Sequence, residues 1–275
     1  MLIKKAVKAL KNLFFTKAFN YADFLQNAIN KKKNNKYLSR AEIICRMHEK
    51  IRNGEQLTDF DYFQLVQCIN VSKLSGKLDG FYSISTSVLK NPICHARACN
   101  NKTICSKCYA ATSTAYRTEL ALALDTNYDI LNGFLIPESA WSALPIYSSN
   151  GKSRIESHGD IATVTGARNY LRIIKTHKHL FFGVWSKNWN IWLTAFKLEG
   201  KPENMNFILS SEIINKVSEV PEKIKPYVDK VFTVYDKDYI KENGIDINCG
   251  GRSCKTCLKC YEKENPIFHI SEQLK

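Results

Sequence analysis

Residues 180–209 read LFFGVWSKNWNIWLTAFKLEGKPENMNFIL, and this stretch decides the predicted fold. The apolar run at residues 180–185 predicts a buried strand, residues 189–198 repeat apolar side chains at helical spacing, and residues 206–209 predict a second strand. A strand, a helix and a further strand in this order are typical of a βαβ unit, in which the two strands are parallel.

The same alternation continues on both sides of this stretch. Further strands are expected at residues 81–85, at 144–147 or 153–157, and at 231–235, and helical patterns cover residues 110–131, 164–175 and 211–217. A closed eight-stranded barrel would need about 200–250 residues. Residues 75–275 supply only five or six convincing strands. We therefore expect an α/β fold, an open or partial (β/α) barrel with mostly parallel strands.

The first 70 residues differ from this pattern in periodicity and in charge. Their apolar positions fall three and four residues apart, as at Ile43, Ile44, Met47 and Ile51, which indicates helices. Residues 1–60 carry 13 basic and 5 acidic side chains, a large share of the net charge of +14. We expect two parts, a basic helical segment at residues 1–70 and an α/β domain at residues 71–275.

The densest basic patch is the run KKKNNK at residues 31–36. Basic clusters attract nucleic acid, so nucleic acid is a predicted partner of this segment, and a solvated surface loop is the alternative. Ile3, Val7, Leu10 and Phe14 fall at helical spacing, which fits a helix docked on the domain or one lying at a membrane surface. No stretch reaches the roughly 18 consecutive apolar residues that a membrane-spanning helix requires.

Ten cysteines are the most informative feature of the composition. The start of the chain shows no secretory signal, so we expect a cytoplasmic, reducing compartment in which disulfides are rare. Cys45 and Cys68 lie in helical pattern and are predicted to be small buried side chains. The other eight cysteines, the predicted metal ligands, form two groups of four: Cys94, Cys99, Cys105 and Cys108, and Cys249, Cys254, Cys257 and Cys260.

The spacing inside these groups is typical of metal sites. The C-x2-C unit serves both zinc and iron–sulfur sites. In the second group three cysteines are spaced by two residues, as in ferredoxins, and the spacing from Cys249 to Cys257 also matches plant-type ferredoxins. One zinc site would pair Cys105 and Cys108 with Cys257 and Cys260 and would leave four clustered cysteines unused. The pattern favours an iron–sulfur cluster of the [4Fe–4S] type, with zinc as the alternative.

Functional groups of parallel α/β folds gather at the carboxyl ends of the strands. Both cysteine groups follow predicted strands, so we expect both cysteine loops at one rim, beside the polar residues that end the other strands. The predicted catalytic residues are Arg154, His158, Asp160 and Lys187, and the predicted cofactor-binding residues are Ser157, Gly159 and Ser210. Arg154, Glu156 and His158 would share one face of a continuing strand. The structural alternative is that Asp160 caps the next helix and that Arg154 pairs with Glu156 or with another acid inside the barrel.

Five segments stand out along the α/β domain: Lys77-Leu78 with Ser83-Ile84-Ser85, Cys105-Ser106-Lys107-Cys108-Tyr109-Ala110, Arg154-x3-His158-Gly159-Asp160, Trp185-Ser186-Lys187, and the final Cys-x2-Cys-x2-Cys. Together they resemble the phage gene product 88 family, which is found in phages and mobile elements. The resemblance covers about residues 72–262. It implies a phage or mobile-element protein in the host cytoplasm.

The ending Cys105-x2-Cys108-Tyr109-Ala110 is also similar to radical S-adenosylmethionine enzymes, whose partial αβ barrels carry a cluster after the first strand. This resemblance implies an iron–sulfur cluster at the first cysteine group and S-adenosylmethionine as a cosubstrate, with residues 157–160 standing in for a glycine-rich loop. Those enzymes use Cys-x3-Cys-x2-Cys. Here five residues separate Cys99 from Cys105. The first group also has four cysteines, and four thiolates could occupy every ligand position of the cluster.

Three functions from different classes remain open. The first is an iron–sulfur enzyme of radical or redox type, with the cluster at the carboxyl rim and with Arg154, His158 and Asp160 positioning an unidentified substrate. The second is a zinc-stabilised protein that binds nucleic acid through its basic front segment. The third is a host-interaction protein without catalysis. The polar residues at the rim favour the first, and the charge of residues 1–60 favours the second.

Overall fold

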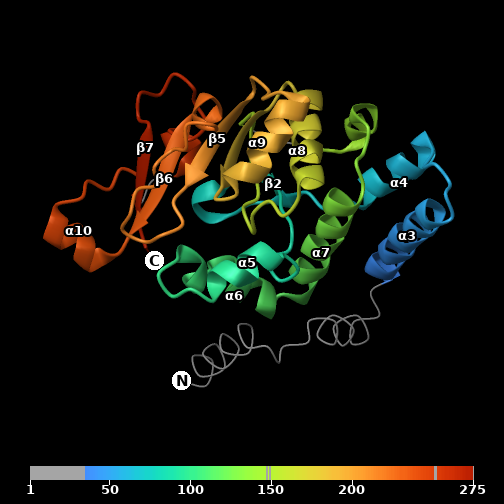
Figure 1. Ribbon diagram of the computed structural model, residues 1–275, viewed down its shortest axis with the longest axis horizontal. Coiled ribbons are helices and arrows are strands. Elements are labelled where there is room, and N and C mark those ends of the chain that lie inside the picture. The colour runs from blue at the N-terminus through green and yellow to red at the C-terminus, as the bar shows by residue number, and fades with distance from the viewer. Residues whose placement is uncertain (1–34, 147, 149, 251–252, 275) are drawn as a thin grey trace.

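The computed structural model describes residues 35–146, 148, 150–250 and 253–274 (Figure 1). Within these residues seven strands form one sheet whose strand order follows the chain order from β1 to β7. β1 is antiparallel to β2, and every other neighbouring pair is parallel. The strands are β1 Ser72–Lys73, β2 Tyr82–Ile84, β3 Lys152–Ile155, β4 Phe181–Ser186, β5 Met205–Ser210, β6 Lys230–Tyr235 and β7 His269–Gln273. Because β1 and β7 are the two edges, the sheet is open and mostly parallel, as predicted.

Helices precede the sheet and connect most of its strands. They are α3 Asn35–Arg52, α4 Asp59–Cys68, α5 Pro92–Ala98, α6 Tyr109–Tyr116, α7 Thr118–Gly133, α8 Val164–Thr176, α9 Trp189–Glu199, α10 Lys237–Asn243 and α11 Cys254–Cys257. Short 3-10 turns add η1 Gly76–Leu78, η2 Ile104–Lys107, η3 Glu138–Ala143 and η4 Lys225–Tyr227. α8 and α9 lie side by side and cover one face of the sheet (Figure 1).

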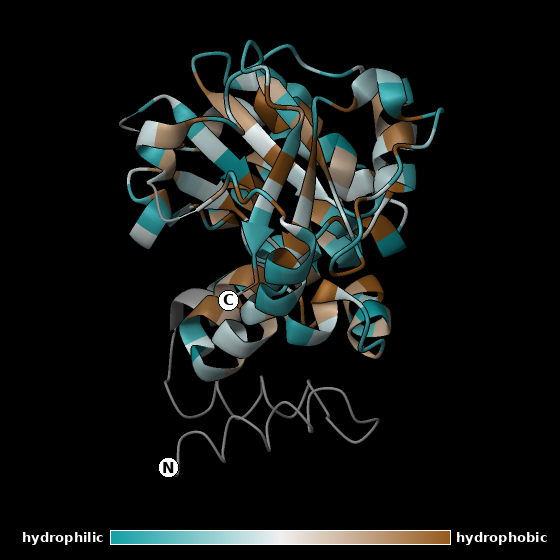
Figure 2. Ribbon diagram, turned by 90° about the vertical axis from the view of Figure 1, so that its left-hand side faces the viewer, coloured by the Kyte–Doolittle hydropathy of each residue, from teal (hydrophilic) through white to brown (hydrophobic). Residues whose placement is uncertain are grey.

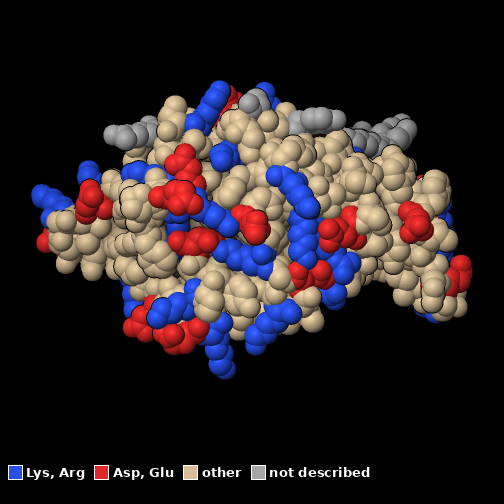
Figure 3. Space-filling view, turned by 90° about the horizontal axis from the view of Figure 1, so that it is seen from above, with Lys and Arg blue, Asp and Glu red and all other residues tan. Residues whose placement is uncertain are grey.

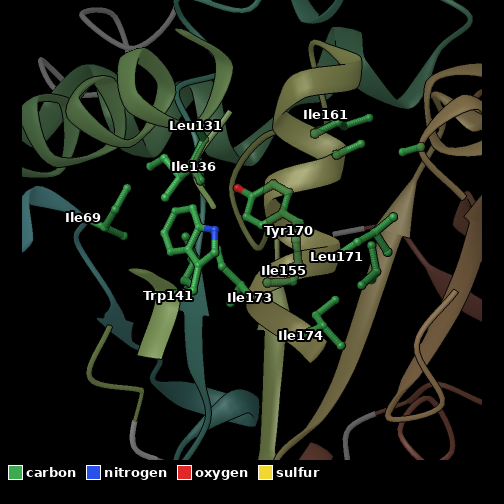
Figure 4. Close-up of a cluster of buried hydrophobic side chains, with 14 of the residues drawn as sticks. Ile69, Leu131, Ile136, Trp141, Ile155, Ile161, Tyr170, Leu171, Ile173 and Ile174 are labelled. Carbon is green, nitrogen blue, oxygen red and sulfur yellow. The ribbon is translucent and has the colours of Figure 1, made fainter. Parts of the chain in front are cut away.

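The main hydrophobic core lies between that face of the sheet and the helices. Ile84, Ile155, Val184 and Phe207 are paired in register across β2 to β5, so their side chains point to the same face. All four belong to one buried cluster with side chains of α8. Figure 4 shows Ile155 of this cluster beside Tyr170 and Leu171 of α8. In Figure 2 the hydrophobic residues concentrate where strands and helices face one another. This burial fixes which face of each strand is turned away from the core.

The opposite face of the sheet carries the residues that precede these core positions. Ser83, Arg154, Gly183 and Asn206 form a row in register across β2 to β5. The chain between α10 and β7, which contains the second cysteine group, crosses this face. There the Asn206 side-chain amide donates to the Cys260 carbonyl over 3.1 Å. We call this surface the open face of the sheet.

The two described N-terminal helices share the core of the α/β domain. Met47 of α3 and Leu65 of α4 are fully buried in the same cluster as the sheet residues. Thr58 caps α4 and forms a capping box with Asp61. The boundary at residue 70 stays a prediction. The stripe from Ile3 to Phe14 and most of the lysine run lie outside the described residues.

Two predicted helices differ from the structure, and one strand is present that was not predicted. The helix expected at residues 110–131 is two helices, α6 and α7, that meet at Arg117. The helix expected at residues 211–217 is wrong, because Ile213 pairs with Thr103 in a β-bridge and Asn215 has a φ of 65°. β7 was not expected at all. None of the described helices is long and apolar enough to cross a membrane.

Candidate functional site

The carboxyl ends of β2 and β3 carry a buried network of serine hydroxyls. Ser83 shares a hydrogen bond with Ser85 over 3.0 Å, and Ser85 shares one with Ser157, also over 3.0 Å. Ser157 in turn lies 3.2 Å from Nδ1 of His158. The phenol of Tyr109, at the start of α6, donates to the Ser157 carbonyl. Two predicted site residues, Ser157 and His158, are therefore fixed between the first cysteine loop and two strands.

His158 is held as a neutral imidazole. Burial, with the nearby charges of Arg154 and Arg117, lowers its pKa to about 4. Its ring packs edge-on against Tyr109, with 5.9 Å between the centroids. A neutral imidazole has one nitrogen that donates and one that accepts, so His158 can hydrogen-bond to a bound molecule.

Glu156 does not continue the strand toward His158. β3 ends at Ile155, and Glu156 has a φ of 55°, so the predicted alternation of side chains stops there. Its carboxyl is buried and accepts hydrogen bonds from Thr86 N at 3.0 Å, Thr86 Oγ1 at 2.7 Å and Tyr170 Oη at 2.8 Å. Glu156 thus joins the ends of β2 and β3 to α8. The suggested pair between Arg154 and Glu156 is wrong.

The backbone at Gly159 is fitted closely to this carboxyl. Gly159 has a φ of 104°, and a Cβ atom there would lie 2.8 Å from the Thr86 carbonyl oxygen and 3.0 Å from Glu156 Oε2. Only glycine can adopt this positive φ and also leave room for the Thr86 carbonyl and the Glu156 carboxyl. The sequence pattern assigned Gly159 to cofactor binding, and the structure gives it a second role in turning the loop.

We expect Glu156 to make stability depend on pH. Burial raises its pKa from 4.5 to about 7, although the hydrogen bonds from Thr86 and Tyr170 lower it. Between these two values the unfolded chain loses the proton that the folded protein keeps, so the free energy of unfolding falls as pH rises, by about 3 kcal/mol over the window. Below pH 4.5 Glu156 is protonated in the folded and in the unfolded protein, so this loss of unfolding free energy is absent.

The measurement is urea denaturation of the wild type and of Glu156→Gln between about pH 4.5 and 7.5. The variant has no titrating group at this position, so the difference in unfolding free energy between the two proteins should shrink or reverse as pH rises. Parallel stability curves for the two proteins across this window would contradict the assignment.

Asp160 connects the end of β3 to the end of β4. Its carboxylate accepts hydrogen bonds from Ser186 Oγ at 2.5 Å, Lys187 N at 2.9 Å and Ile161 N at 2.8 Å. Arg97 of α5 lies 3.7 Å from the same carboxylate. The suggested role of Asp160 as a helix cap is wrong, because Thr163 caps α8. Asp160 is a buried anchor between two strand ends and α5.

The side-chain amine of Lys187 lies within electrostatic range of the first cysteine group. Burial lowers the pKa of its amine, but the negative charges of Cys105, Asp160 and Cys94 outweigh this, and the net shift is upward. Arg97 also faces this region and donates to Glu212 over 2.9 Å. The predicted residues Asp160 and Lys187 therefore meet the first cysteine loop at the carboxyl rim, and Arg97 is a neighbour that the sequence pattern did not single out.

The structure brings together three of the four cysteines of the first group. Burial raises the pKa of Cys94 well above its ordinary value, and the charges of Asp160, Cys105 and Cys108 raise it further. Cys94 and Cys108 also pack against the same small cluster of Val88, Leu89 and Ala110. Cys99 is exposed at the carboxyl end of α5. We call Cys94, Cys105 and Cys108 the rim cysteines.

All four cysteines of the second group lie within electrostatic range of one another. Burial raises the pKa of Cys260 to about 12, with further raising contributions from Cys249, Cys254 and Cys257 and a lowering one from Arg154. Cys254 and Cys257 are the ends of the single turn α11. Cys249 is tied to β7 by a 2.9 Å hydrogen bond from its N–H to the Ser271 carbonyl.

This second group does not lie at the carboxyl rim. α11 contacts η1, which precedes β2, and Lys255 lines a pocket with Tyr82 and Leu180 at the starts of β2 and β4. Tyr261 packs on Phe81, just before β2, with ring centroids 4.8 Å apart. The expectation that both loops lie at one rim is therefore wrong for Cys254, Cys257 and Cys260, which lie on the open face toward the amino ends of the strands, whereas Cys249 lies beside the carboxyl half of β7.

Basic side chains surround the second group. Arg154 lowers the pKa of Cys254 and of Cys260, and Lys77 lowers that of Cys249 and Cys254, in each case against a larger raising effect of burial. Lys77 also pairs with Glu272 of β7. Buried Lys230 donates to the carbonyls of Asn265 at 3.1 Å and Ile267 at 3.0 Å. These cations can balance the negative charge of the four cysteines in their thiolate form.

The remaining predicted residues have simpler surroundings. Ser210 ends β5 and is largely buried, while its neighbour Ser211 bonds Thr233 over 2.8 Å. Cys68 is buried as predicted, but Cys45 is exposed. No group of three or more His, Cys, Asp or Glu side chains in the described ranges is close enough to hold a metal ion. Seen from above, basic and acidic side chains mix across the surface (Figure 3).

Comparisons with known proteins gave one match. A family model described as gene product 88 matches residues 67–273. Searches of curated proteins and of solved structures gave no match. The matched residues run from the end of α4 to the end of β7 and include both cysteine groups and all the rim residues described above.

Proposed function

The chain belongs to the phage gene product 88 family, and from its two separate cysteine groups we propose that it is an iron–sulfur enzyme of redox or radical type. The observation that carries the proposal is the meeting of the rim cysteines with Asp160, Lys187 and the network of Ser157 and His158 at the carboxyl ends of parallel strands. This is the edge at which parallel α/β folds hold their reacting groups.

The rim cysteines would bind the active cluster. Cys94, Cys105 and Cys108 come from α5, from η2 and from the residue after η2. Three thiolates leave one position of a four-iron cluster for another ligand. That count supports S-adenosylmethionine as a cosubstrate, beside Ser157 and Gly159. When bound, an iron–sulfur cluster supplies one-electron chemistry.

The second group would bind a further cluster with four thiolate ligands. Its spacing is that of ferredoxins, and the cations Lys77, Arg154 and Lys230 stand within reach of its charge. Charge and hydrogen bonds around the sulfurs set the potential of such centres. We therefore assign this group to electron transfer and the rim cysteines to the substrate.

The protein's own polar residues have separate roles in this proposal. Lys187 and Arg97 offset the negative charge of the rim cysteines. Asp160 holds the Lys187 backbone and keeps the two strand ends in place. His158, neutral at pH 7, donates or accepts a hydrogen bond beside the substrate. We place this chemistry in the reducing cytoplasm of the host.

The test is metal and sulfide analysis of the full chain purified without oxygen. Two four-iron clusters predict about eight irons and as many sulfides in each brown protein molecule. Zinc in a colourless protein would contradict the iron–sulfur assignment and favour a structural metal. A protein without metal whose thiols all react freely in the native state would contradict both.

A further inference from the structure

Arg154 is a half-buried cation on the open face that lacks a carboxylate partner. Its guanidinium lies over the Trp185 ring at 4.1 Å. Its Nε is buried and has no hydrogen-bond partner among the described residues. None of the ion pairs in the described part of the chain includes it. A charge removed from water without a partner is costly, so the position calls for an anion.

Two more buried polar atoms without partners lie on the same face. They are Oδ1 of Asn206 and the hydroxyl of Tyr261, again counted within the described residues. Asn206 stands in the same row as Arg154, with Gly183 of β4 between them. Tyr261 packs on Trp185 with 5.6 Å between the ring centroids, and the charge of Arg154 reaches it. Buried polar groups are seldom unpaired, and three together point to a ligand.

Gly183 explains how the two rings reach the row. A Cβ atom at this position would lie 2.6 Å from the Trp185 ring and 2.7 Å from the Tyr261 ring. Glycine therefore lets both rings lie across the strand, and the guanidinium carbon of Arg154 lies over the indole. A guanidinium packed on an aromatic ring keeps N–H groups free for hydrogen bonds to an oxyanion.

The nearby carboxylates are engaged elsewhere. Glu156 follows Arg154 by two residues, but it is bound to Thr86 and to Tyr170 of α8. Glu272 pairs with Lys77. The groups left on the open face are thiols, a phenol, an amide and the Arg154 cation, and this set attracts an anion.

We propose that Arg154 binds an oxyanion group, a carboxylate or a phosphate, of a small molecule on the open face of the sheet, between the two cysteine groups. That this molecule is the substrate rests on the proposed function, whereas the oxyanion site itself needs no metal. On the far side of Gly183 the Tyr261 hydroxyl can donate to the oxyanion, whereas Asn206 Oδ1 can only accept from an N–H or O–H group of the same molecule. Arg154 is thus the residue that selects an anionic ligand.

The experiment titrates the full-length protein, as purified without oxygen, with inorganic phosphate and separately with acetate as the simplest carboxylate. Binding is measured by calorimetry and by Trp fluorescence, at constant ionic strength in chloride buffer. We expect saturable binding of one of the two anions and a higher melting temperature with it. The anion that binds identifies the chemical class.

Three variants test the residue. Arg154→Lys keeps the positive charge but loses the two parallel N–H donors of the guanidinium, and it should weaken anion binding about tenfold or more. Arg154→Gln should abolish it. Lys197→Gln removes an exposed charge from α9, on the other face of the sheet, and should bind like the wild type. Equal weakening in Arg154→Gln and Lys197→Gln, which each remove one positive charge, would show attraction by net charge alone and would overturn the proposal.

Metal content, measured on the same samples, separates this inference from the proposed function. Arg154-dependent anion binding in a protein without iron supports the oxyanion site and overturns the iron–sulfur assignment. Loss of metal in Arg154→Lys with unchanged anion binding would show that Arg154 serves only as a counter-ion of the second cysteine group and does not hold the oxyanion, and the inference fails. It also fails if neither anion binds saturably to the wild type.

Discussion

Replacement of Cys105 by alanine is expected to remove one of the two proposed iron–sulfur centres, so that the iron content falls from about eight atoms to about four per chain. Cys105 belongs to η2 and acts electrostatically on Cys94, Cys108 and Lys187. A cluster needs all three rim cysteines because the protein supplies no other thiolate at that point. Activity toward any substrate should vanish with the iron.

Cys99→Ala is the matched control for this variant. Cys99 lies in the same loop and would be the fourth ligand by sequence spacing, but it is exposed and follows the last residue of α5. We expect the Cys99→Ala protein to keep about eight irons. Iron analysis, sulfide analysis and the visible spectrum of anaerobic samples decide. Equal loss of iron in both variants would mean that four thiolates close the cluster and that no position is left for a cosubstrate.

Gly159→Ala is expected to give the largest loss of stability of any single methyl group added to the loop after β3. The new Cβ would lie 2.8 Å from the Thr86 carbonyl and 3.0 Å from Glu156 Oε2, at a φ of 104°. The carbonyl belongs to the buried backbone and the carboxyl is held by three hydrogen bonds, so neither can move cheaply. The expected cost is about 3–5 kcal/mol from backbone strain and overpacking together.

Gly151→Ala is the control that separates the cost of backbone strain from the cost of the steric clash expected at Gly159. Gly151 has a φ of 66°, but a Cβ atom there would meet nothing within 4 Å. Its substitution should cost only the backbone term, about 1–2 kcal/mol. Urea denaturation of both variants at one pH gives the comparison. A Gly159 variant as stable as the Gly151 variant would show that Glu156 and Thr86 are not held as the structure places them.

Local apolar patterns were sufficient to predict the central strands. β4, β5 and β6 are apolar runs because each is covered on its core face and flanked by other strands, and burial of this kind is visible in the sequence. β7 was missed because it reads HISEQ, with a single aliphatic residue, and owes its place to pairing with β6. Such pairing depends on residues distant in the chain.

The positions of candidate site residues that directly follow strands could be predicted from the sequence. The position of the second cysteine group, in a loop that folds back across the sheet, could not. Parallel strands brought Ser157, His158, Asp160 and Lys187 to one rim, as expected from their positions after β3 and β4. The second cysteine group has spacing that predicts a metal site, but spacing cannot say which side of the sheet a long loop crosses. The ring contacts of Tyr261 decide that.

The pairing of the first cysteine loop with the segment after β5 bears on when the proposed metal centres could form during translation. The N–H of Ile104 donates to the Glu212 carbonyl over 2.9 Å, so this loop is fixed only after about a hundred further residues have left the ribosome. The second group waits for β7, because Cys249 is tied to Ser271 near the end of the chain. If the proposed clusters form, both sets of thiols would therefore stay open to a metal donor until elongation is almost complete.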